Sequence, residues 1–324
     1  MNERERKNAA RRAAVLALPA VQAWHHSRIV PPRQGDVRIS ESIGPFGELM
    51  AVWSAPADRT ARFSEVRPVR VTVHVPEMAV AARIADLRLA HPSVQPLPEG
   101  RVLLVDARCA WRSEGPDRNA VVYDCDGEAV AEQTFGDGID HVQATRNGEI
   151  WVGYFDEGVL GSHGWGVDGA APPVGRSGLV RFSADLTEQW RYPDSARLVW
   201  GRILDCYALN VDGETAWACF YTEWPIVRIH DGSVTGWHNE IRGAAALTVR
   251  GSRLALYGGY EPVRDRLVAG VLGDNEFRVT GEYRLVLPDG GEVPREARVF
   301  GRGADLHIVT RHDWYRLSLE DLPA

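Results

Sequence analysis

Residues 141–154 read HVQATRNGEIWVGY, and this stretch decides the fold. Two short runs rich in strand-forming residues, 141–145 and 150–154, flank the dipeptide Asn147-Gly148. Runs of this length and composition between turn residues are typical of β-strands. Asn-Gly tolerates the positive φ angles that a two-residue hairpin turn requires. The stretch therefore predicts an antiparallel β-hairpin.

The hairpin belongs to a longer unit that recurs along the chain. Two further strands are predicted at 178–182 and 188–192, so that four strands follow one another as a meander. A second clear copy uses Asp212-Gly213 as its hairpin turn. The four strands predicted for that copy are 207–211, 215–220, 226–229 and 234–238.

Four weaker copies are centred on glycines 47, 100, 251 and 303, with strands predicted after the turn at 48–54, 101–105, 253–257 and 306–309. The six turn glycines, in chain order, are 53, 48, 65, 38 and 52 residues apart. A four-stranded propeller blade repeats every ~40 to 50 residues. We therefore predict an all-β fold, a six-bladed β-propeller of four-stranded antiparallel blades.

The last copy is one strand short, because it ends with a strand at 314–318. An incomplete blade would leave an exposed edge. We predict that residues 21–30 supply the missing strand, so that an N-terminal strand closes the last blade; the alternative is a disordered leader. As domains we expect an N-terminal extension at 1–20 that can form a helix, and a single propeller domain at 21–324 with a Gly-rich loop insertion at 158–176.

Composition narrows the classes of partner. The net charge is -7 and the pI near 5.8, and Lys7 is the single lysine beside 36 arginines. Without a basic stretch beyond the first residues, the chain could not neutralise several phosphates, so we expect no nucleic-acid partner. No window reaches the ~20 apolar residues of a membrane helix, so we expect no membrane partner either. We expect a monomer whose ligand is a small molecule or a protein.

The first residues leave two cellular locations open. Arg11-Arg12 precede a short apolar run at 13–21, and residues 21–23 resemble a small-residue cleavage site. Glu3 and Glu5 count against a secretory leader, which should be purely positive there. We therefore expect a cytoplasmic protein, with export as the alternative.

Two segments carry a resemblance to known proteins, GDGIDHV at 136–142 and GEIWVGYFDEG at 148–158. They resemble uncharacterised propeller-like proteins of high-GC bacteria, in which a similar run precedes a Gly-rich insertion. More distantly, the predicted architecture is similar to the lactonase and gluconolactonase group of six-bladed propellers. That group holds one divalent cation at the mouth of its tunnel through Glu, Asn and Asp side chains. Its motif does not map onto this chain, so no catalytic residue is carried over.

Candidate site residues come from the loops that enter a blade and the loops that join its second and third strands, because these share one face of a propeller. They are Asp137, Asp140, His141, Asp156, Glu157, His163, Trp165, Asp205, Glu223, Trp224 and His312. Asp140, Asp156 and Asp205 could hold a divalent cation such as calcium, which takes oxygen ligands. The alternatives are a solvated acidic rim, or an anionic ligand bound by Arg242, Arg295 and Arg298. His163 and Trp165 are the expected contacts of the insertion, unless it is an ordinary mobile loop.

The cysteines give one geometric prediction. With Asp212-Gly213 as the turn, Cys206 and Cys219 should face each other across the hairpin. Two free thiols are expected in a reducing cytosol, and a disulfide only after export.

Motifs for zincin, α/β-hydrolase, P-loop and Rossmann chemistry are missing from the sequence. We therefore predict a ligand- or protein-binding propeller. The alternative is a divalent-metal-assisted hydrolase or lyase acting at the mouth of the propeller channel.

Overall fold

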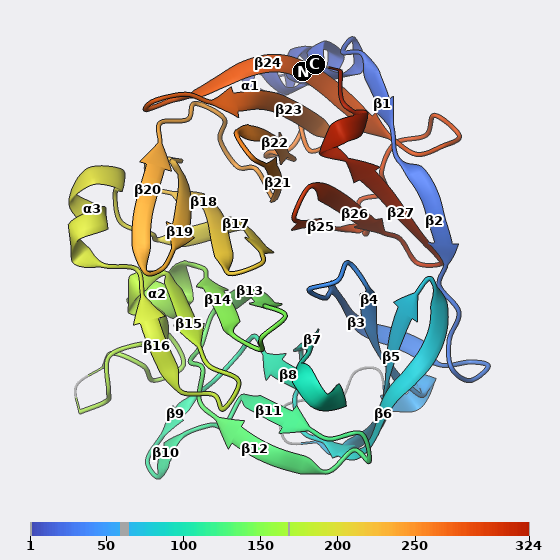
Figure 1. Ribbon diagram of the computed structural model, residues 1–324, viewed down its shortest axis with the longest axis vertical. Coiled ribbons are helices and arrows are strands. Elements are labelled where there is room, and N and C mark those ends of the chain that lie inside the picture. The colour runs from blue at the N-terminus through green and yellow to red at the C-terminus, as the bar shows by residue number, and fades with distance from the viewer. Residues whose placement is uncertain (1, 59–64, 168, 324) are drawn as a thin grey trace. The chain divides into compact units, whose positions relative to one another are not determined.

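The predicted meander of four antiparallel strands occurs six times in a computed structural model that describes residues 2–58, 65–167 and 169–323. Each copy is a separate sheet, and the sheets are coloured in chain order in Figure 1. The chain is therefore a six-bladed β-propeller, as predicted. Two compact units hold three blades each: unit 1 is Met1–Ile29 with Tyr207–Ala324, and unit 2 is Val30–Cys206.

Unit 2 contains blades one to three. Blade one consists of β3 (Val37–Ile43), β4 (Leu49–Ser54), β5 (Arg67–Val75) and β6 (Glu77–Leu87). Blade two consists of β7 (Pro92–Pro96), β8 (Val102–Asp106), β11 (Ala120–Tyr123) and β12 (Ala129–Gln133). Blade three consists of β13 (Ile139–Ala144), β14 (Ile150–Tyr154), β15 (Leu179–Phe182) and β16 (Glu188–Arg191). A two-stranded hairpin, β9 (Trp111–Arg112) with β10 (Gly115–Pro116), is inserted in blade two. The helical segments are α2 (Asp156–Leu160), α3 (Asp194–Trp200), and the 3-10 helices η1 (Pro56–Asp58), η2 (Pro98–Gly100) and η3 (Val174–Ser177).

Unit 1 contains blades four to six, except that Asp205 and Cys206, the first two residues of blade four, belong to unit 2. Blade four consists of β17 (Asp205–Asp212), β18 (Thr215–Tyr221), β19 (Ile226–His230) and β20 (Ser233–Trp237). Blade five consists of β21 (Ala246–Arg250), β22 (Arg253–Tyr257), β23 (Arg266–Leu272) and β24 (Phe277–Val286). Blade six consists of β25 (Arg298–Arg302), β26 (Asp305–Val309), β27 (Asp313–Ser318) and β2 (Trp24–Arg28). The remaining elements are helix α1 (Glu3–Leu16), strand β1 (Ala20–Gln22) and the 3-10 helix η4 (Leu319–Asp321).

An N-terminal strand completes the last blade, which confirms the prediction. β2 pairs antiparallel with β27, placing Trp24 opposite Arg316 and Arg28 opposite Asp313. The strand before it was not predicted: β1 pairs parallel with β24 as a fifth strand of blade five, with Ala20 opposite Arg284. The N-terminal residues 20–28 therefore add strands to two blades of unit 1.

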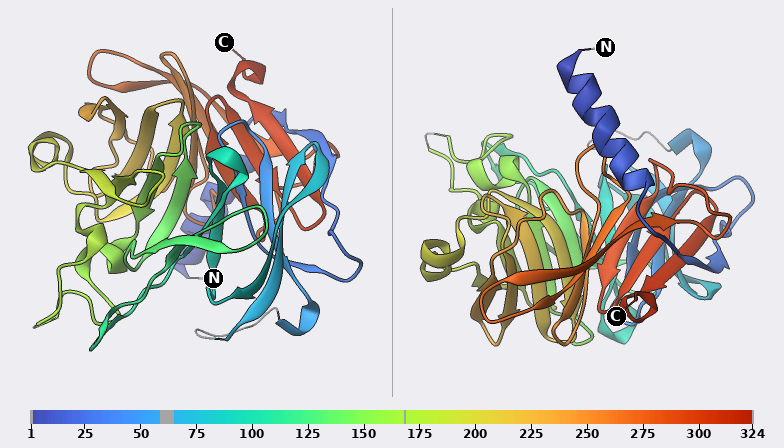
Figure 2. Two further views of the ribbon diagram at one scale, coloured as in Figure 1. Left: turned by 60° about the horizontal axis from the view of Figure 1, so that its bottom comes forward. Right: turned by 90° about the horizontal axis from the view of Figure 1, so that it is seen from above.

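Helix α1 precedes these strands and projects away from the sheets of unit 1, as the right-hand view of Figure 2 shows. Asn2 and Glu5 form a capping box, in which the Asn2 side chain accepts the backbone N–H of Glu5 and the Glu5 carboxylate accepts that of Asn2. Val15 is the buried residue of the helix, and Arg12 ties it to the unit through Asp265. No helix among the described residues is long and apolar enough to cross a membrane.

The hairpin that decided the fold forms, but its loop is longer than the predicted two-residue turn at Asn147-Gly148: Ala144 pairs with Ile150, and Asn147 does not have a positive φ. The amide N–H of Gly148 donates to the Thr145 carbonyl at 3.1 Å, and Gly148 has a left-handed φ of 86°. A Cβ at this position would lie 2.9 Å from the Pro98 ring, so glycine is needed for space as well as for conformation. The β13–β14 hairpin then places Gln143 opposite Trp151 and Val142 opposite Val152.

The four cysteines are free thiols, and Cys206 and Cys219 are both buried. Cys206 lies on β17 and Cys219 on β18, which are neighbouring strands of blade four. The turn between them lies at 213–214, one residue later than the predicted Asp212-Gly213 turn, because Asp212 ends β17 and Thr215 begins β18. The direct cross-strand pairing of the two cysteines stays a prediction. Burial raises the pKa of the Cys219 thiol to about 12, so it is protonated at neutral pH.

Each meander brings three chain segments to one end of its own sheet. The segment entering the first strand, the loop joining the second and third strands and the segment leaving the fourth strand all lie there, because successive strands run in opposite directions. We call this the loop-bearing end of a blade. Most candidate residues lie in such segments.

Candidate functional site

In unit 2, the buried carboxylate of Asp137 holds two loops together. Its Oδ1 accepts the backbone N–H of Cys109 at 2.8 Å and lies 3.2 Å from Nε of Arg108. Its Oδ2 accepts the Ser162 hydroxyl and lies 3.1 Å from Nδ1 of His163. Arg108 and Cys109 belong to the loop after β8, whereas Ser162 and His163 belong to the insertion. We call these five residues the Asp137 network.

The insertion is consequently a docked structure with helical segments, α2 and η3, at its two ends. The backbone N–H of Trp111 donates to the His163 carbonyl at 2.9 Å, and Nε1 of Trp165 donates to the Cys109 carbonyl at 2.8 Å. The rings of Trp111 and Trp165 pack edge to face at 5.1 Å. Trp165 is only 4% exposed, so its visible role is to anchor the insertion.

His163 is the member of the network that a ligand could reach, since its side chain is about half exposed. Its Nδ1 lies between Oδ2 of Asp137 and Nη2 of Arg108, which is 2.7 Å away. The residue has a left-handed φ of 45°, which is uncommon for a residue with a side chain. Arg108 also pairs with Glu157 at 2.6 Å, so its positive charge is compensated by two carboxylates.

Three predicted carboxylates of unit 2 interact electrostatically. Asp205 has its pKa raised to about 6, first by burial and then by the negative charges of Asp140 and Asp156. His141, whose Nε2 lies 3.4 Å from Oδ2 of Asp140, acts in the opposite direction. Like charges held near a partly buried carboxyl are typical of functional sites, although structural networks show them too. Among the described residues, no three His, Cys, Asp or Glu side chains are placed to hold a metal ion.

Unit 1 has a pocket of about 410 Å³ at the loop-bearing end of blade four. It includes the predicted residues Glu223, Trp224 and Arg242, and we call it the Trp224 pocket. Its lining residues are Tyr221, Thr222, Glu223, Trp224, Asn239, Glu240 and Arg242. They come from the loop between β18 and β19 and from the segment that leaves β20.

Asn239 fixes the floor of this pocket. Its buried side-chain amide donates to the carbonyls of Trp224 at 3.0 Å and of Ile241 at 2.9 Å, and its carbonyl accepts the Ile241 N–H at 3.0 Å. Trp224 has a left-handed φ of 61° and is only 6% exposed. A fully bonded buried amide of this kind rigidifies its surroundings, so the pocket is held in shape without a ligand.

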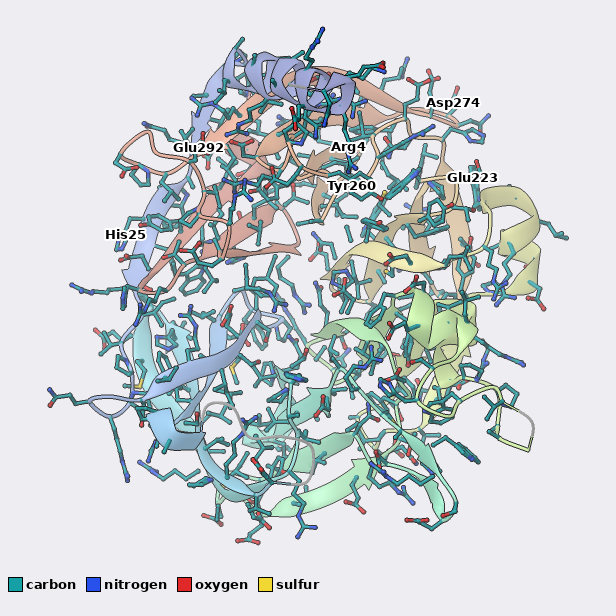
Figure 3. All side chains as sticks on the ribbon, turned by 180° about the vertical axis from the view of Figure 1, so that it is seen from behind. Arg4, His25, Glu223, Tyr260, Asp274 and Glu292 are labelled. Atoms are coloured by element: carbon teal, nitrogen blue, oxygen red, sulfur yellow. The ribbon has the colours of Figure 1, made fainter. Side chains whose placement is uncertain are left out.

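Three tyrosines surround the Trp224 ring. Its centroid lies 4.6 Å from Tyr207, 5.8 Å from Tyr221 and 6.2 Å from Tyr260. The hydroxyls of Tyr207 and Tyr260 are hydrogen-bonded at 2.6 Å, which sets the two rings at 81° to each other. Tyr221 and Tyr260 are 45% and 54% exposed, so the cluster has a buried side and an open side. Figure 3 labels Glu223 and Tyr260 on neighbouring blades of unit 1.

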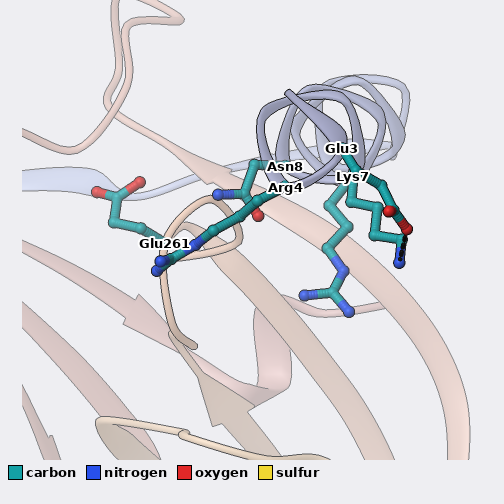
Figure 4. A pocket seen from close by; sticks show the side chains of 6 residues that line it. Glu3, Arg4, Lys7, Asn8 and Glu261 are labelled. Carbon is teal, nitrogen blue, oxygen red and sulfur yellow. Dashed lines mark ion pairs between the residues drawn. The ribbon is translucent and has the colours of Figure 1, made fainter. Parts of the chain in front are cut away.

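A second recess, of about 590 Å³, lies between α1 and the loop at Glu261 (Figure 4). Its lining is almost wholly one side of the helix, with Arg4, Lys7 and Arg11 as its cations. Lys7 is already paired with Glu3 at 2.7 Å, and both side chains are mostly exposed. Side chains this exposed are flexible and screened, so they define no fixed site.

The remaining predicted residues lie elsewhere in unit 1. His312 is in the turn between β26 and β27, where its carbonyl accepts the Ile29 N–H at 2.7 Å. Arg295 lies 3.4 Å from Glu261, and Arg298 lies over the Phe300 ring. None of the three lines the Trp224 pocket.

Sequence reasoning missed Arg108, Ser162, Tyr221, Asn239, Glu240 and Tyr260. Arg108, Tyr221 and Tyr260 lie at or near the junction between the second and third strands of their blades, where the rule already used could have found them. Asn239 and Glu240 follow a fourth strand, and that segment lies at the same end of the sheet. Ser162 also lies between a second and a third strand, but nothing in the sequence shows that its loop docks on Asp137.

Comparisons with known proteins assign no family to this chain. No protein-family model matches the chain, and no curated protein sequence matches it. The similarity to lactonase and gluconolactonase propellers and to proteins of high-GC bacteria therefore stays a prediction.

Similar solved structures include the Cps50 (Swd1) β-propeller domain of Myceliophteria thermophila, with 12% identity and a TM-score of 0.48, covering 91% of this chain and 89% of that one. A catalytically inactive virginiamycin B lyase from Staphylococcus aureus with quinupristin has 10% identity and a TM-score of 0.44, covering 90% and 98%. A nidogen/laminin complex has 12% identity and a TM-score of 0.43, covering 77% and 81%. None of these brings a ligand or reaction to this chain.

Replacement of Asp137 should destabilise the protein. Asp137→Ala leaves the Cys109 N–H unsatisfied and removes a buried carboxylate from Arg108, so we expect a loss of about 3 kcal/mol in the free energy of unfolding. Asp137→Asn keeps the shape and should lose less. Urea denaturation followed by circular dichroism measures both. Glu99→Gln, at a side chain that is 82% exposed, is the control, with an effect within about 0.5 kcal/mol. Equal losses for Asp137→Ala and the control would contradict a role in holding the loops.

The raised pKa of Asp205 predicts a pH dependence of stability. The folded protein binds this proton more tightly than the unfolded chain, whose carboxyl has the ordinary value of 3.8. The resulting stabilisation is complete below pH 3.8 and is lost as the pH rises through about 6. The side chain of Asp205→Asn stays neutral at every pH. The melting temperature of this variant minus that of the wild type should therefore increase between pH 4 and pH 7 and stay constant above pH 7. The exposed Asp126→Asn is the control, and a pH-independent difference for Asp205→Asn would refute the assignment.

Proposed function

We propose that this propeller is a small-molecule-binding protein and that the Trp224 pocket is its ligand site. The observation that carries the proposal is a rigid recess whose charged wall residues form no ion pair within the part of the chain that the structure describes. Glu223, Glu240 and Arg242 are exposed and form no ion pair with any residue that the structure describes. A pocket with a few convergent polar groups and aromatic side chains is the usual form of a small-molecule site.

The size and stiffness of the pocket support a small ligand. A volume of about 410 Å³ falls within the ~300 to 1,000 Å³ typical of ligand pockets. Because Asn239 already fixes Trp224 and Ile241, binding would cost little ordering of the floor. Tyr221, at the end of β18, is the exposed aromatic wall that a ligand could cover.

A thermal-shift screen of a chemically diverse metabolite library tests this function. Compounds that raise the melting temperature of the wild type should lose affinity by about tenfold or more in Tyr221→Ala, because an aromatic wall contributes roughly 1 to 2 kcal/mol to binding. Phe46→Ala is the matched control, since Phe46 is an aromatic residue of unit 2 that is 72% exposed. Hits that bind Tyr221→Ala and Phe46→Ala equally well would place the ligand elsewhere and overturn the proposal.

The second candidate function is a divalent-metal-assisted hydrolase or lyase using Asp140, Asp156 and Asp205. The raised pKa of Asp205 favours it, because a cation among these carboxylates would relieve their repulsion. A bound cation could polarise a carbonyl group or activate a water molecule. The arrangement of the described side chains supplies no ready set of three ligands, so this function ranks second.

Metal binding gives this second candidate a direct test. Purified protein is dialysed exhaustively, analysed for bound metal, and melted with calcium, magnesium, manganese or zinc at pH 7. If the candidate is right, one of these ions raises the melting temperature of the wild type and not that of Asp205→Asn. An equal response of both proteins, or no response in either, would exclude these carboxylates as a metal site.

A further inference from the structure

We infer that the ligand of the Trp224 pocket is a small zwitterion with a methylated ammonium group, and this inference rests on the proposed function. The wall of the pocket carries two negative groups, Glu223 and Glu240, and one positive group, Arg242. A molecule with complementary charges has a positively charged head group, which would face the two glutamates, and a negatively charged tail, which would face the arginine.

The lack of partners is informative in a chain so rich in arginine. Exposed glutamates elsewhere in unit 1 do find one: Glu282 lies 2.9 Å from Arg266, and Glu320 lies 2.6 Å from Arg250. Glu223 and Glu240 line one pocket with Arg242, yet neither forms an ion pair with it or with any other described residue. Their charges are therefore available to a ligand.

The aromatic side chains favour an organic cation over a metal ion. Tyr221 and Trp224 line the pocket, and their rings stand at 55° to each other, so they form a corner of differently oriented faces. Tyr260 packs against the Trp224 ring at 88° but is not one of the lining residues. The face of an aromatic ring attracts a cation electrostatically, most strongly when that cation is poorly hydrated, as a methylated ammonium is. A hard metal ion needs several oxygen ligands at short range, and the described residues include no such group.

The Trp224 side of the corner is supported by Tyr260, which packs against the Trp224 ring and is itself held from two sides. Its hydroxyl is bonded to that of Tyr207, and a Cβ at Gly243 would come within 2.9 Å of its ring. Gly243 directly follows Arg242, so the support of the aromatic corner and the single cation of the wall are joined through adjacent residues. A head group on the rings and an anionic tail near Arg242 would therefore use every unpaired charge of the pocket.

Two probes of nearly identical shape test the charge of the head group. Glycine betaine carries a trimethylammonium group and a carboxylate, and 3,3-dimethylbutanoate replaces the nitrogen with carbon. We expect calorimetric titration and tryptophan fluorescence to show saturable betaine binding, with 3,3-dimethylbutanoate at least about tenfold weaker. Glu223→Gln combined with Glu240→Gln should weaken betaine by about tenfold or more. Asp274→Asn, which removes an exposed carboxylate of unit 1 outside the pocket, should leave it unchanged.

The outcomes separate the inference from the function on which it rests. Equal or tighter binding of 3,3-dimethylbutanoate, or a neutral compound whose binding depends on Tyr221, would overturn the ammonium assignment and leave the pocket as a ligand site. Failure of betaine, tetramethylammonium and every library compound to saturate the pocket would overturn both. Circular dichroism of each variant establishes that it is folded, and Tyr221→Leu provides a second variant that removes the exposed ring of the lining without changing charge.

Discussion

A β-strand at the edge of a sheet exposes unpaired backbone groups, and blade six depends on the N-terminal segment to cover one. β27 would be its outer edge, and β2 pairs with it from Trp24 to Arg28. This pairing places the first and last parts of the chain in the same compact unit. β1 and α1 follow from it: β1 lies on β24, and Arg12 of α1 reaches the buried Asp265.

Both loop clusters depend on one buried polar side chain that binds backbone groups of other segments. Asp137 does this in unit 2, where it joins the loop after β8 to the insertion, and Asn239 does it in unit 1 beneath Trp224. Beside each of them a residue with a side chain adopts a left-handed backbone, His163 at 45° and Trp224 at 61°. Such conformations persist where the surrounding bonds determine them, so the bonds of Asp137 and Asn239 help to hold these two residues in place.

The sequence predicted the strands well because their turns carry strong local signals. The strand predicted at 150–154, after Gly148, has the same bounds as β14. The strand predicted at 253–257, after Gly251, has the same bounds as β22. β1 had no such signal, since three residues pair in parallel with a strand more than 260 positions later. Trp165 was predicted as a contact because it lies in a glycine-rich loop, and only the docking on Cys109 shows that it is buried. Glu223, Trp224 and Arg242 were predicted separately, whereas their common pocket depends on how blade four ends.

The two clusters differ in how their charges are balanced. In the Asp137 network, Arg108 lies between Asp137 and Glu157, so attraction within the protein accounts for the positions of all three groups. In the Trp224 pocket, the described contacts give Glu223, Glu240 and Arg242 no partner, and the fold gains nothing from keeping them together. The same atoms beside a rigid aromatic floor are well suited to a ligand that brings the missing charges. Attraction within the protein therefore accounts for the first cluster, whereas for the second we propose a ligand from outside the chain.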